Sequence, residues 1–208
     1  MLAIIGSALC MFAKVVVEIS TPVPGNTALI SNTGYPMYWE REDFPLTISV
    51  QEGTNENLRY ALEEAVLVWN GTVGHTVFEI REQHDAASRV HGLITFEERD
   101  LHNWGPGYFA GLTQYRLANS ITGQIGQLHS ASVWVDTNVH KDSYYLIVLH
   151  ELGHTLGLAH DTDPSSCMFP LVALTMENIE GCDREHVRRM VAPWVTLILG
   201  ELLLDVFR

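Results

Sequence analysis

The sequence predicts an α+β (mixed α/β) fold in which short strands and a crossover helix form one mixed sheet. Apolar and polar residues alternate over residues 46–50, the period of two that is typical of a strand. The apolar spacing then changes to that of a helix over residues 55–70. Residues 77–81 and 92–96 add two short strands, and this order of strand, helix, strand and strand favours a single mixed sheet.

Two further strands are expected in the second half of the chain. Residues 102–130 are rich in glycine, which indicates loops, but residues 109–116 within this stretch have the composition of a strand. Residues 130–136 predict the next strand. These segments extend the α+β pattern and contain no internal repeat.

One folded domain with short appendages accounts for the chain of 208 residues. Its apolar fraction of 47% and charged fraction of 18% are ordinary for a globular protein that buries a core. Residues 1–36 hold the apolar segment Leu2–Ala13 and a linker rich in proline and glycine. The apolar segment would be a signal or pro-segment, with a buried first strand as the alternative. The folded body is expected over residues 37–194 and an apolar tail over residues 195–208.

Charge and cysteine content exclude several classes of protein. With 12 basic and 25 acidic side chains the formal net charge is -13, which repels the phosphate backbone of nucleic acids and disfavours anionic membrane surfaces. Three cysteines, Cys10, Cys167 and Cys182, are too few for a disulfide-rich scaffold and form no CxxC pair. Cys167 and Cys182 could form one disulfide or remain two buried thiols.

The chemically informative segment is HELGHTLGLAHD, which begins at His150 and follows an apolar stretch that Asp142 or Ser143 can cap as a helix. On a helix, His150 and His154 lie one turn apart and about 40° apart around the axis, so both imidazoles can reach one metal ion. Glu151 follows His150 by one residue, about 100° around the helix axis, so its side chain lies beside the two histidines and not at the metal position. Its carboxylate can therefore accept a proton from water instead of binding the metal.

A third metal ligand follows a predicted turn. Gly157 can adopt positive φ, end the helix and turn the chain back, which would bring His160 to the same ion. Three histidines with an open fourth position are typical of a catalytic zinc site. The HExxH pattern alone arises by chance or as paired surface histidines. Gly157 and His160 at their fixed offsets make the zinc interpretation far more specific.

These residues resemble the metzincin peptidases, whose signature is HExxHxxGxxH. The following SCMFP, which contains Met168, is similar to the Met-turn of the matrixin branch, the matrix metalloproteinases and their relatives. The resemblance implies the metzincin-type zincin fold, with a twisted mixed five-stranded sheet, an active-site helix, a Met-turn and a C-terminal helix at residues 183–192. It also implies that residues 109–116 are the antiparallel edge strand that pairs with an extended peptide substrate.

The sequence departs from the matrixin pattern at several positions. Matrixins usually carry serine after the third histidine, whereas Asp161 stands here, as in the adamalysin branch. Pro170 occupies the position where astacins place a tyrosine ligand. The sequence contains no PRCGxPD segment, and Cys10 lies in a different context. Latency through a thiolate on zinc is therefore not supported.

Further metal sites are less specific in the sequence. Histidines outside the motif are scattered, and exposed or hydrogen-bonded imidazoles are the simplest interpretation of them. A second, structural zinc would use His102 and His129, which lie in the Gly-rich stretch where matrixins often place such ligands. Calcium (Ca²⁺) is the alternative, because aspartates and backbone carbonyls of that stretch would suit it.

The sequence therefore predicts a zinc-dependent endopeptidase that acts on proteins or peptides and is secreted or extracellular. One catalytic Zn²⁺ would be held by His150, His154 and His160, with Glu151 as the general base. One alternative is a particle- or surface-associated docking component that retains a metallopeptidase fold and docks through its apolar ends. Another is an exopeptidase or amidase on a similar zinc helix, although the turn at Gly157 favours the endopeptidase.

Overall fold

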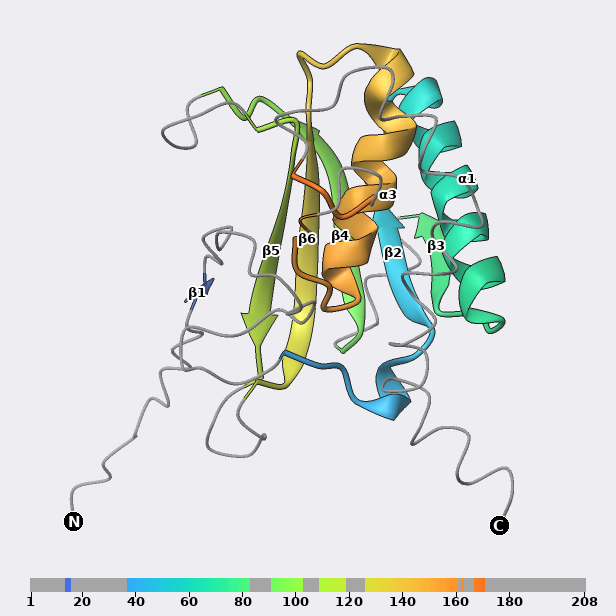
Figure 1. The fold of residues 1–208 in the computed structure, drawn as a ribbon, viewed down its shortest axis with the longest axis vertical. Coiled ribbons are helices and arrows are strands. Elements are labelled where there is room, and N and C mark those ends of the chain that lie inside the picture. Colours follow the sequence, from blue (N-terminus) through green and yellow to red (C-terminus); the bar gives the residue numbers. More distant parts are fainter. Residues whose placement is uncertain are drawn as a thin grey trace, which may run out of the picture.

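A computed structural model describes residues 14–15, 37–82, 91–102, 109–118, 126–160, 162 and 167–170, and it shows a sheet covered by two helices (Figure 1). The strands are β1 (Lys14–Val15), β2 (Leu46–Val50), β3 (Phe78–Glu82), β4 (Leu93–Arg99), β5 (Gly111–Leu117) and β6 (Leu128–Asp136). The helices are α1 (Glu56–Val73) and α3 (Tyr144–Thr155), with two short 3-10 helices, η1 (Arg41–Asp43) and η2 (Lys141–Ser143).

The sheet is mixed, and its strands have the order β1-β5-β6-β4-β2-β3. Strands β3, β2, β4 and β6 run parallel to one another, whereas β5 runs antiparallel to β6. The five longer strands confirm the predicted five-stranded sheet. Strand β1 is a sixth strand that directly follows the segment Leu2–Ala13, for which a first strand is the alternative prediction, and it pairs with β5 at Tyr115 and Arg116. The prediction that β5 is the edge strand is therefore wrong for this end of the strand, because β1 lies outside it.

Helix α1 connects the parallel strands β2 and β3, which a tight turn cannot join. The Asn55 side chain accepts a hydrogen bond from the first turn of the helix, and Gly74 ends the helix with a φ of 77°. The helix extends to Val73, beyond the predicted end at residue 70. The Asn70 side-chain oxygen accepts hydrogen bonds from the backbone amides of Val77 and Phe78, which connects the end of the helix to the start of β3.

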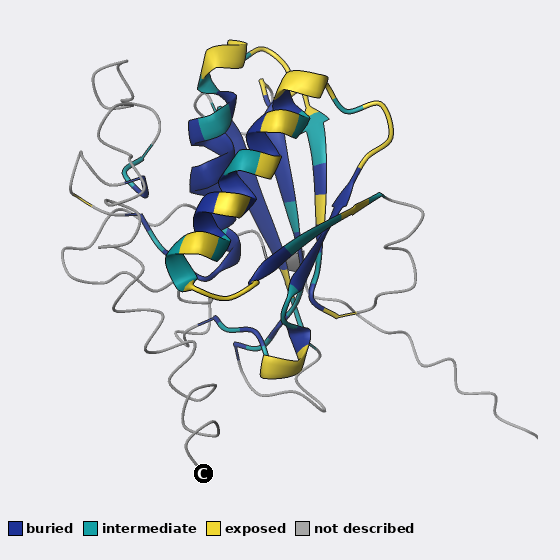
Figure 2. Ribbon diagram, turned by 90° about the vertical axis from the view of Figure 1, so that its right-hand side faces the viewer, coloured by how far each residue is buried: buried dark blue, intermediate teal, exposed yellow. Residues whose placement is uncertain are grey.

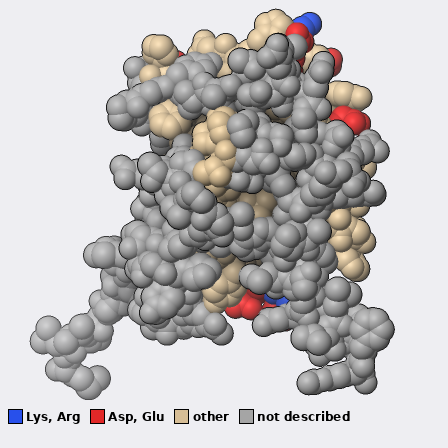
Figure 3. Space-filling model, in the orientation of Figure 1, with Lys and Arg blue, Asp and Glu red and all other residues tan. Residues whose placement is uncertain are grey.

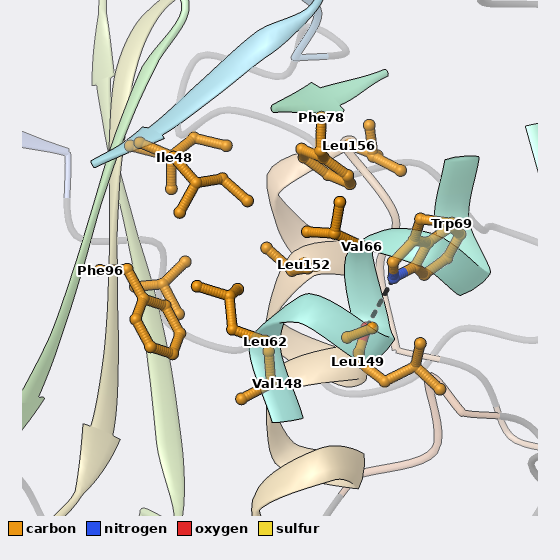
Figure 4. Close-up of a cluster of buried hydrophobic side chains, with 14 of the residues drawn as sticks. Ile48, Leu62, Val66, Trp69, Phe78, Phe96, Val148, Leu149, Leu152 and Leu156 are labelled. Carbon is orange, nitrogen blue, oxygen red and sulfur yellow. Dashed lines mark hydrogen bonds between the residues drawn. The ribbon is translucent and has the colours of Figure 1, made fainter. Parts of the chain in front are cut away.

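Helices α1 and α3 pack against each other, and their buried sides face the sheet while exposed residues lie on the outside (Figure 2). Figure 4 shows the apolar core of this interface, where Leu62 of α1 lies close to Leu152 of α3. Trp69 also donates its indole N–H to the Leu149 carbonyl oxygen at 3.1 Å. Burial of each large apolar side chain contributes about 1.5–3 kcal/mol. This packing fixes α3 on the sheet.

The start of α3 differs from the predicted N-cap. Ser143 occupies the N-cap position but has helical dihedral angles (φ −90°, ψ −13°) and makes no side-chain capping hydrogen bond. His140 instead caps η2, by accepting a hydrogen bond from the Asp142 amide at 3.4 Å. The prediction of a cap at Asp142 or Ser143 is therefore wrong. The 3-10 helix runs directly into α3, which removes the extended residue that a side-chain cap requires.

Several predicted features lie outside the described residues. They are the segment Leu2–Ala13, the helix at residues 183–192, the tail at residues 195–208, and Cys10 and Cys182. Within the described ranges, neither helix combines the length and apolar character that a membrane span requires.

Candidate metal centre

Helix α3 presents two histidines on one side, and the chain that follows it supplies a third. His150 and His154 are one helical turn apart, and their rings meet edge to face with centroids 4.6 Å apart. The Nε2 atom of His160 lies 3.2 Å from the Nε2 atom of each of them. In the part of the chain that the structure describes, these are the only three metal-binding side chains whose ligand atoms all lie within 4.8 Å of one another.

A glycine turn returns His160 to the helix. Gly157 has a φ of +90°, the positive value expected from the sequence, and its N–H donates to the His154 carbonyl oxygen at 2.7 Å. A Cβ atom at this position would lie 3.2 Å from the Met37 carbonyl oxygen. Both the backbone conformation and the close approach of Met37 therefore favour glycine.

Backbone carbonyl oxygens hold two of the imidazoles through the ring nitrogen that faces away from the centre of the cluster. His150 Nδ1 lies 2.7 Å from the Cys167 carbonyl oxygen, and His154 Nδ1 lies 2.7 Å from that of Leu158. Because a carbonyl oxygen only accepts, each Nδ1 carries the proton and donates it. Each Nε2 then keeps its lone pair and directs it toward the centre of the cluster, which is the arrangement of a metal ligand.

Burial keeps the three imidazoles neutral. It is the main cause that lowers the pKa of His150 well below its ordinary value, that of His154 to about 3 and that of His160 to about 4. Repulsion between the clustered histidines adds to the effect for His150 and His154. Neutral imidazole is the form that binds a metal, so the cluster can accept a divalent cation at neutral pH without first losing protons.

Glu151 lies on α3 beside the cluster and faces β5. Its side chain is 3% exposed, and burial raises its pKa to about 8, while a hydrogen bond from Thr113 acts in the opposite direction. Thr113 Oγ1 donates to Glu151 Oε2 at 2.6 Å. Gly111 leaves room for the carboxylate, because a Cβ atom there would lie 2.6 Å from Glu151 Oε1. The carboxylate is thus confined between the helix and the strand.

Met168 packs beneath α3, where the helix carries a glycine. A Cβ atom on Gly153 would collide with Met168 Sδ and would lie 3.1 Å from the Trp69 ring. The absent side chain therefore makes room for the thioether, which is 2% exposed. Trp39 adds a hydrogen bond from its indole N–H to the Thr155 carbonyl oxygen at 2.7 Å. These contacts fix the segment of α3 that carries the histidines.

The donor set fits zinc. Two nitrogens bound at about 2.05 Å to a tetrahedral zinc ion lie about 3.3 Å apart. His160 Nε2 lies 3.2 Å from each of the other two Nε2 atoms, which agrees with this spacing.

On the face of the molecule shown in Figure 3, the described charged side chains gather at the top, the right side and the lower end, away from the middle of that face.

The structure places the predicted site residues together but changes the expectation for a second metal. His150, His154 and His160 form the cluster, and Glu151 lies next to it. The expected partnership of His102 with His129 is not observed, because the ring of His129 lies against His91 instead. Residue 161 lies outside the described ranges.

Sequence reasoning missed the groups that position the site. The carbonyls of Cys167 and Leu158 carry no side-chain signal, since every residue has a carbonyl. Thr113 did carry one, because strand alternation places Gly111, Thr113 and Tyr115 on the same face of β5. A threonine between a glycine and a tyrosine on a buried face indicates a polar partner on the element that packs there.

Comparison with known proteins identifies the family. The matrixin family model matches residues 38–190. Interstitial collagenase of Bos taurus is 26% identical over 154 residues, which cover 69% of this chain and 31% of the relative. Neutrophil collagenase of Homo sapiens is 26% identical over 154 residues, with 71% and 31% covered, and macrophage metalloelastase of Oryctolagus cuniculus is 29% identical over 128 residues, with 55% and 24% covered. The chain spans 31% of the length of either collagenase. The adamalysin-like aspartate after the third histidine does not change the branch, and the chain belongs to the matrixin family.

Proposed function

We propose that this protein is a zinc-dependent endopeptidase that hydrolyses internal peptide bonds of proteins or peptides. Membership of the matrixin family implies zinc, and His150, His154 and His160 would hold it. The observation that carries the proposal is the convergence of three neutral imidazoles beside the buried carboxylate of Glu151. When bound, zinc supplies a Lewis acid that polarises the scissile carbonyl group and makes water more acidic.

Glu151 would act as the general base and then as the general acid. Its carboxylate accepts the proton of the attacking water and returns it to the nitrogen of the leaving amine. The hydrogen bond from Thr113 holds one carboxylate oxygen in place, so the other is the one directed to the reaction. A cation next to Glu151 favours the ionised carboxylate, which opposes the effect of burial on its pKa.

Strand β5 would bind the substrate backbone. On the side of β5 away from β6, the described strand β1 pairs with Tyr115 and Arg116. The segment Gly111–Gln114 is closer to the catalytic carboxylate, because Gly111 and Thr113 both adjoin Glu151. An extended peptide would pair with this segment through main-chain hydrogen bonds, as in other cases of strand addition.

We propose residues 37–194 as the catalytic domain, Met168 as the Met-turn residue, and a secreted location. The buried position of Met168 beneath the helix supports its role as the floor of the site. The apolar ends of the chain on which the docking alternative depends lie outside the described residues. The family match and the collagenase and metalloelastase relatives favour the peptidase instead.

Cleavage of a quenched fluorescent peptide library by zinc-loaded protein tests the proposal. Glu151→Gln should retain zinc and lose at least about 100-fold in rate, because positioned acid–base groups contribute about 10²–10⁴-fold. Glu63→Gln is the matched control, since Glu63 is half exposed on α1. A chelator should abolish cleavage by the wild type. Cleavage by Glu151→Gln at the wild-type rate would refute the assignment of the base, and stoichiometric zinc without any cleavage by the wild type would favour the docking alternative.

A further inference from the structure

A groove lies between helix α1 and the beginning of helix α3, apart from the metal centre. Its volume of about 490 Å³ is within the range of about 300–1,000 Å³ that is usual for ligand pockets. The groove is at the first turn of α3, whereas His150 and His154 lie in the second half of that helix. The residues that line it include Tyr60, Ala61 and Glu64 of α1 and Lys141, Asp142 and Tyr145 of η2 and α3.

Two tyrosines, one from each helix, line the groove. Tyr60 is 65% exposed and Tyr145 is half-buried, so both rings can be reached from solvent. The face of a tyrosine ring carries negative potential and attracts a cation placed over it. Aromatic side chains from both helices therefore favour a positively charged group in the groove.

The carboxylate of Glu64 has no counter-ion among the residues that the structure describes. The one basic residue of α1, Arg59, forms ion pairs with Glu63 and Glu82 instead. Lys141 lies at the exposed rim of the groove and forms no described ion pair with Glu64. Glu64 is half-buried, and a carboxylate that has lost part of its hydration is stabilised by an opposite charge. The groove therefore offers a cation a carboxylate that is not already neutralised.

A second carboxylate lies on the opposite wall of the groove. Asp142 of η2 is exposed and lies 3.3 Å from the Nδ1 atom of His140. Together Glu64 and Asp142 exceed the single positive charge of Lys141. The groove thus has a net negative charge, which complements a basic side chain and repels an acidic one.

An exposed leucine continues the same face of α1 beyond the groove. Leu67 is 61% exposed, and in the described part of the chain Tyr60 and Leu67 are the two exposed large hydrophobic residues. Residues seven apart on a helix differ by about 20° around the axis and by about 10.5 Å along it. Figure 2 shows that the outer side of the helices is exposed. A single exposed apolar residue is ordinary, but an aligned pair beside a charged groove indicates an interaction surface.

We propose that the groove and Leu67 form a docking surface for a segment of a partner protein that carries an arginine and an apolar residue. The guanidinium group stacks on the tyrosine rings and pairs with the carboxylate of Glu64. An extended segment rises about 3.3 Å per residue, so an apolar residue three positions from the arginine reaches Leu67. The formal net charge of -13 also attracts a basic partner over a longer range. This surface does not involve the metal centre and does not depend on the proposed peptidase activity.

An NMR titration of the ¹⁵N-labelled full chain with the capped peptide Leu-Gly-Gly-Arg tests the proposal. The amide signals of Tyr60, Glu64, Leu67 and Tyr145 should shift. A peptide with citrulline, the neutral isostere, in place of arginine should bind about three- to tenfold more weakly. Equal affinities for the two peptides would overturn the proposal. Shifts confined to residues 150–160 would show that the peptide binds at the metal centre and would overturn it as well.

Variants separate the groove from the general negative charge of the protein. Glu64→Gln should weaken binding of the arginine peptide about three- to tenfold, whereas Glu97→Gln, which removes the same charge on β4, should leave it unchanged. Equal losses in the two variants would show attraction by net charge alone and would contradict the docking surface.

The role of Leu67 has its own test. Leu67→Ala should weaken binding of the tetrapeptide at least about threefold but leave the weaker binding of N-acetylarginine amide unchanged. Because Leu67 is exposed, this substitution should not disturb the fold. A tetrapeptide that binds Leu67→Ala as tightly as the wild type would refute the two-point docking surface.

Discussion

The hydroxyl of Thr113 donates a 2.6 Å hydrogen bond to Glu151 Oε2, which joins strand β5 to helix α3 at the carboxylate. Both residues are buried. The same hydroxyl also lies 3.2 Å from the Glu151 carbonyl oxygen. A single strand residue thus constrains both the side chain and the backbone of the proposed general base.

Thr113→Val removes this hydrogen bond with little change in volume. Hydrogen bonds to charged groups contribute about 1.5–3 kcal/mol, so kcat should fall by about 10- to 100-fold. The Thr113 bond lowers the pKa of Glu151, so its loss should move the acidic limb of the pH profile of kcat/KM to higher pH. Thr113→Ser should restore both values. An unchanged pH profile in Thr113→Val would show that the hydroxyl does not position the base.

Gly111→Ala should impair catalysis without unfolding the protein. The added methyl group would lie 2.6 Å from Glu151 Oε1, so the carboxylate must move away from β5. We expect kcat to fall by at least about tenfold, since displacements near 1 Å in an active site can cost about 10²-fold. Zinc content should not change. The control is Gly71→Ala, where nothing lies within 4 Å of the added Cβ atom and a small gain in stability is expected in the helix.

Gly157→Ala separates backbone strain from loss of the third ligand. The positive φ of +90° should make the substitution cost about 1–2 kcal/mol of unfolding free energy. Gly74→Ala is the control with a similar φ of +77°, open space around the new Cβ atom and no contact with the cluster. Both variants should lose stability in urea titrations. Gly157→Ala alone should also lose zinc affinity, because His160 is displaced, and equal zinc affinities would contradict this.

The metal-free protein should lose stability between pH 6.5 and pH 8. Burial raises the pKa of Glu151 from 4.5 to about 8, so the folded state binds the proton more tightly, and this contribution is lost as the pH rises through 8. The lowered pKa values of His154 and His160 act in the opposite direction, but only below their ordinary value of 6.5. Titration of Glu151 therefore determines how the stability changes between pH 6.5 and pH 8.

The expected loss over that window is about 2 kcal/mol, since one pKa unit corresponds to about 1.4 kcal/mol. Urea unfolding of chelator-treated protein at the two ends of the window measures it. Glu151→Gln should show a flat dependence because the amide does not titrate. A wild type with equal stability at pH 6.5 and pH 8 would show that Glu151 has an ordinary pKa.

Local periodicity explains which features the sequence could predict. The spacing of His150 and His154 follows from the helical repeat, and the turn at Gly157 follows from the one residue type that tolerates positive φ. Strand β2 was similarly visible in alternating apolar residues, and strands β3 to β6 were visible as short runs with the composition of a strand. In these cases the residue types within a short stretch of sequence are sufficient to determine the local structure.

The features that could not be predicted depend on contacts between distant segments. Thr113 meets Glu151 only because β5 packs on α3, and His129 meets His91 only because β6 lies beside β4. The missing cap at Ser143 has a related cause, because continuation of η2 into α3 supplies the first turn without a side chain. A local sequence pattern does not indicate which strands become neighbours in the sheet.

The three imidazoles proposed to bind zinc come from one short stretch of chain, residues 150–160, while the restraint on Glu151 comes from a strand 38 positions earlier. Closing so short a stretch costs little chain entropy, whereas docking β5 requires most of the sheet to be in place. Metal capture and catalytic competence can therefore be acquired at different stages of folding. A preparation saturated with zinc can still contain chains whose carboxylate is not yet aligned, so metal content should overestimate the fraction of active molecules.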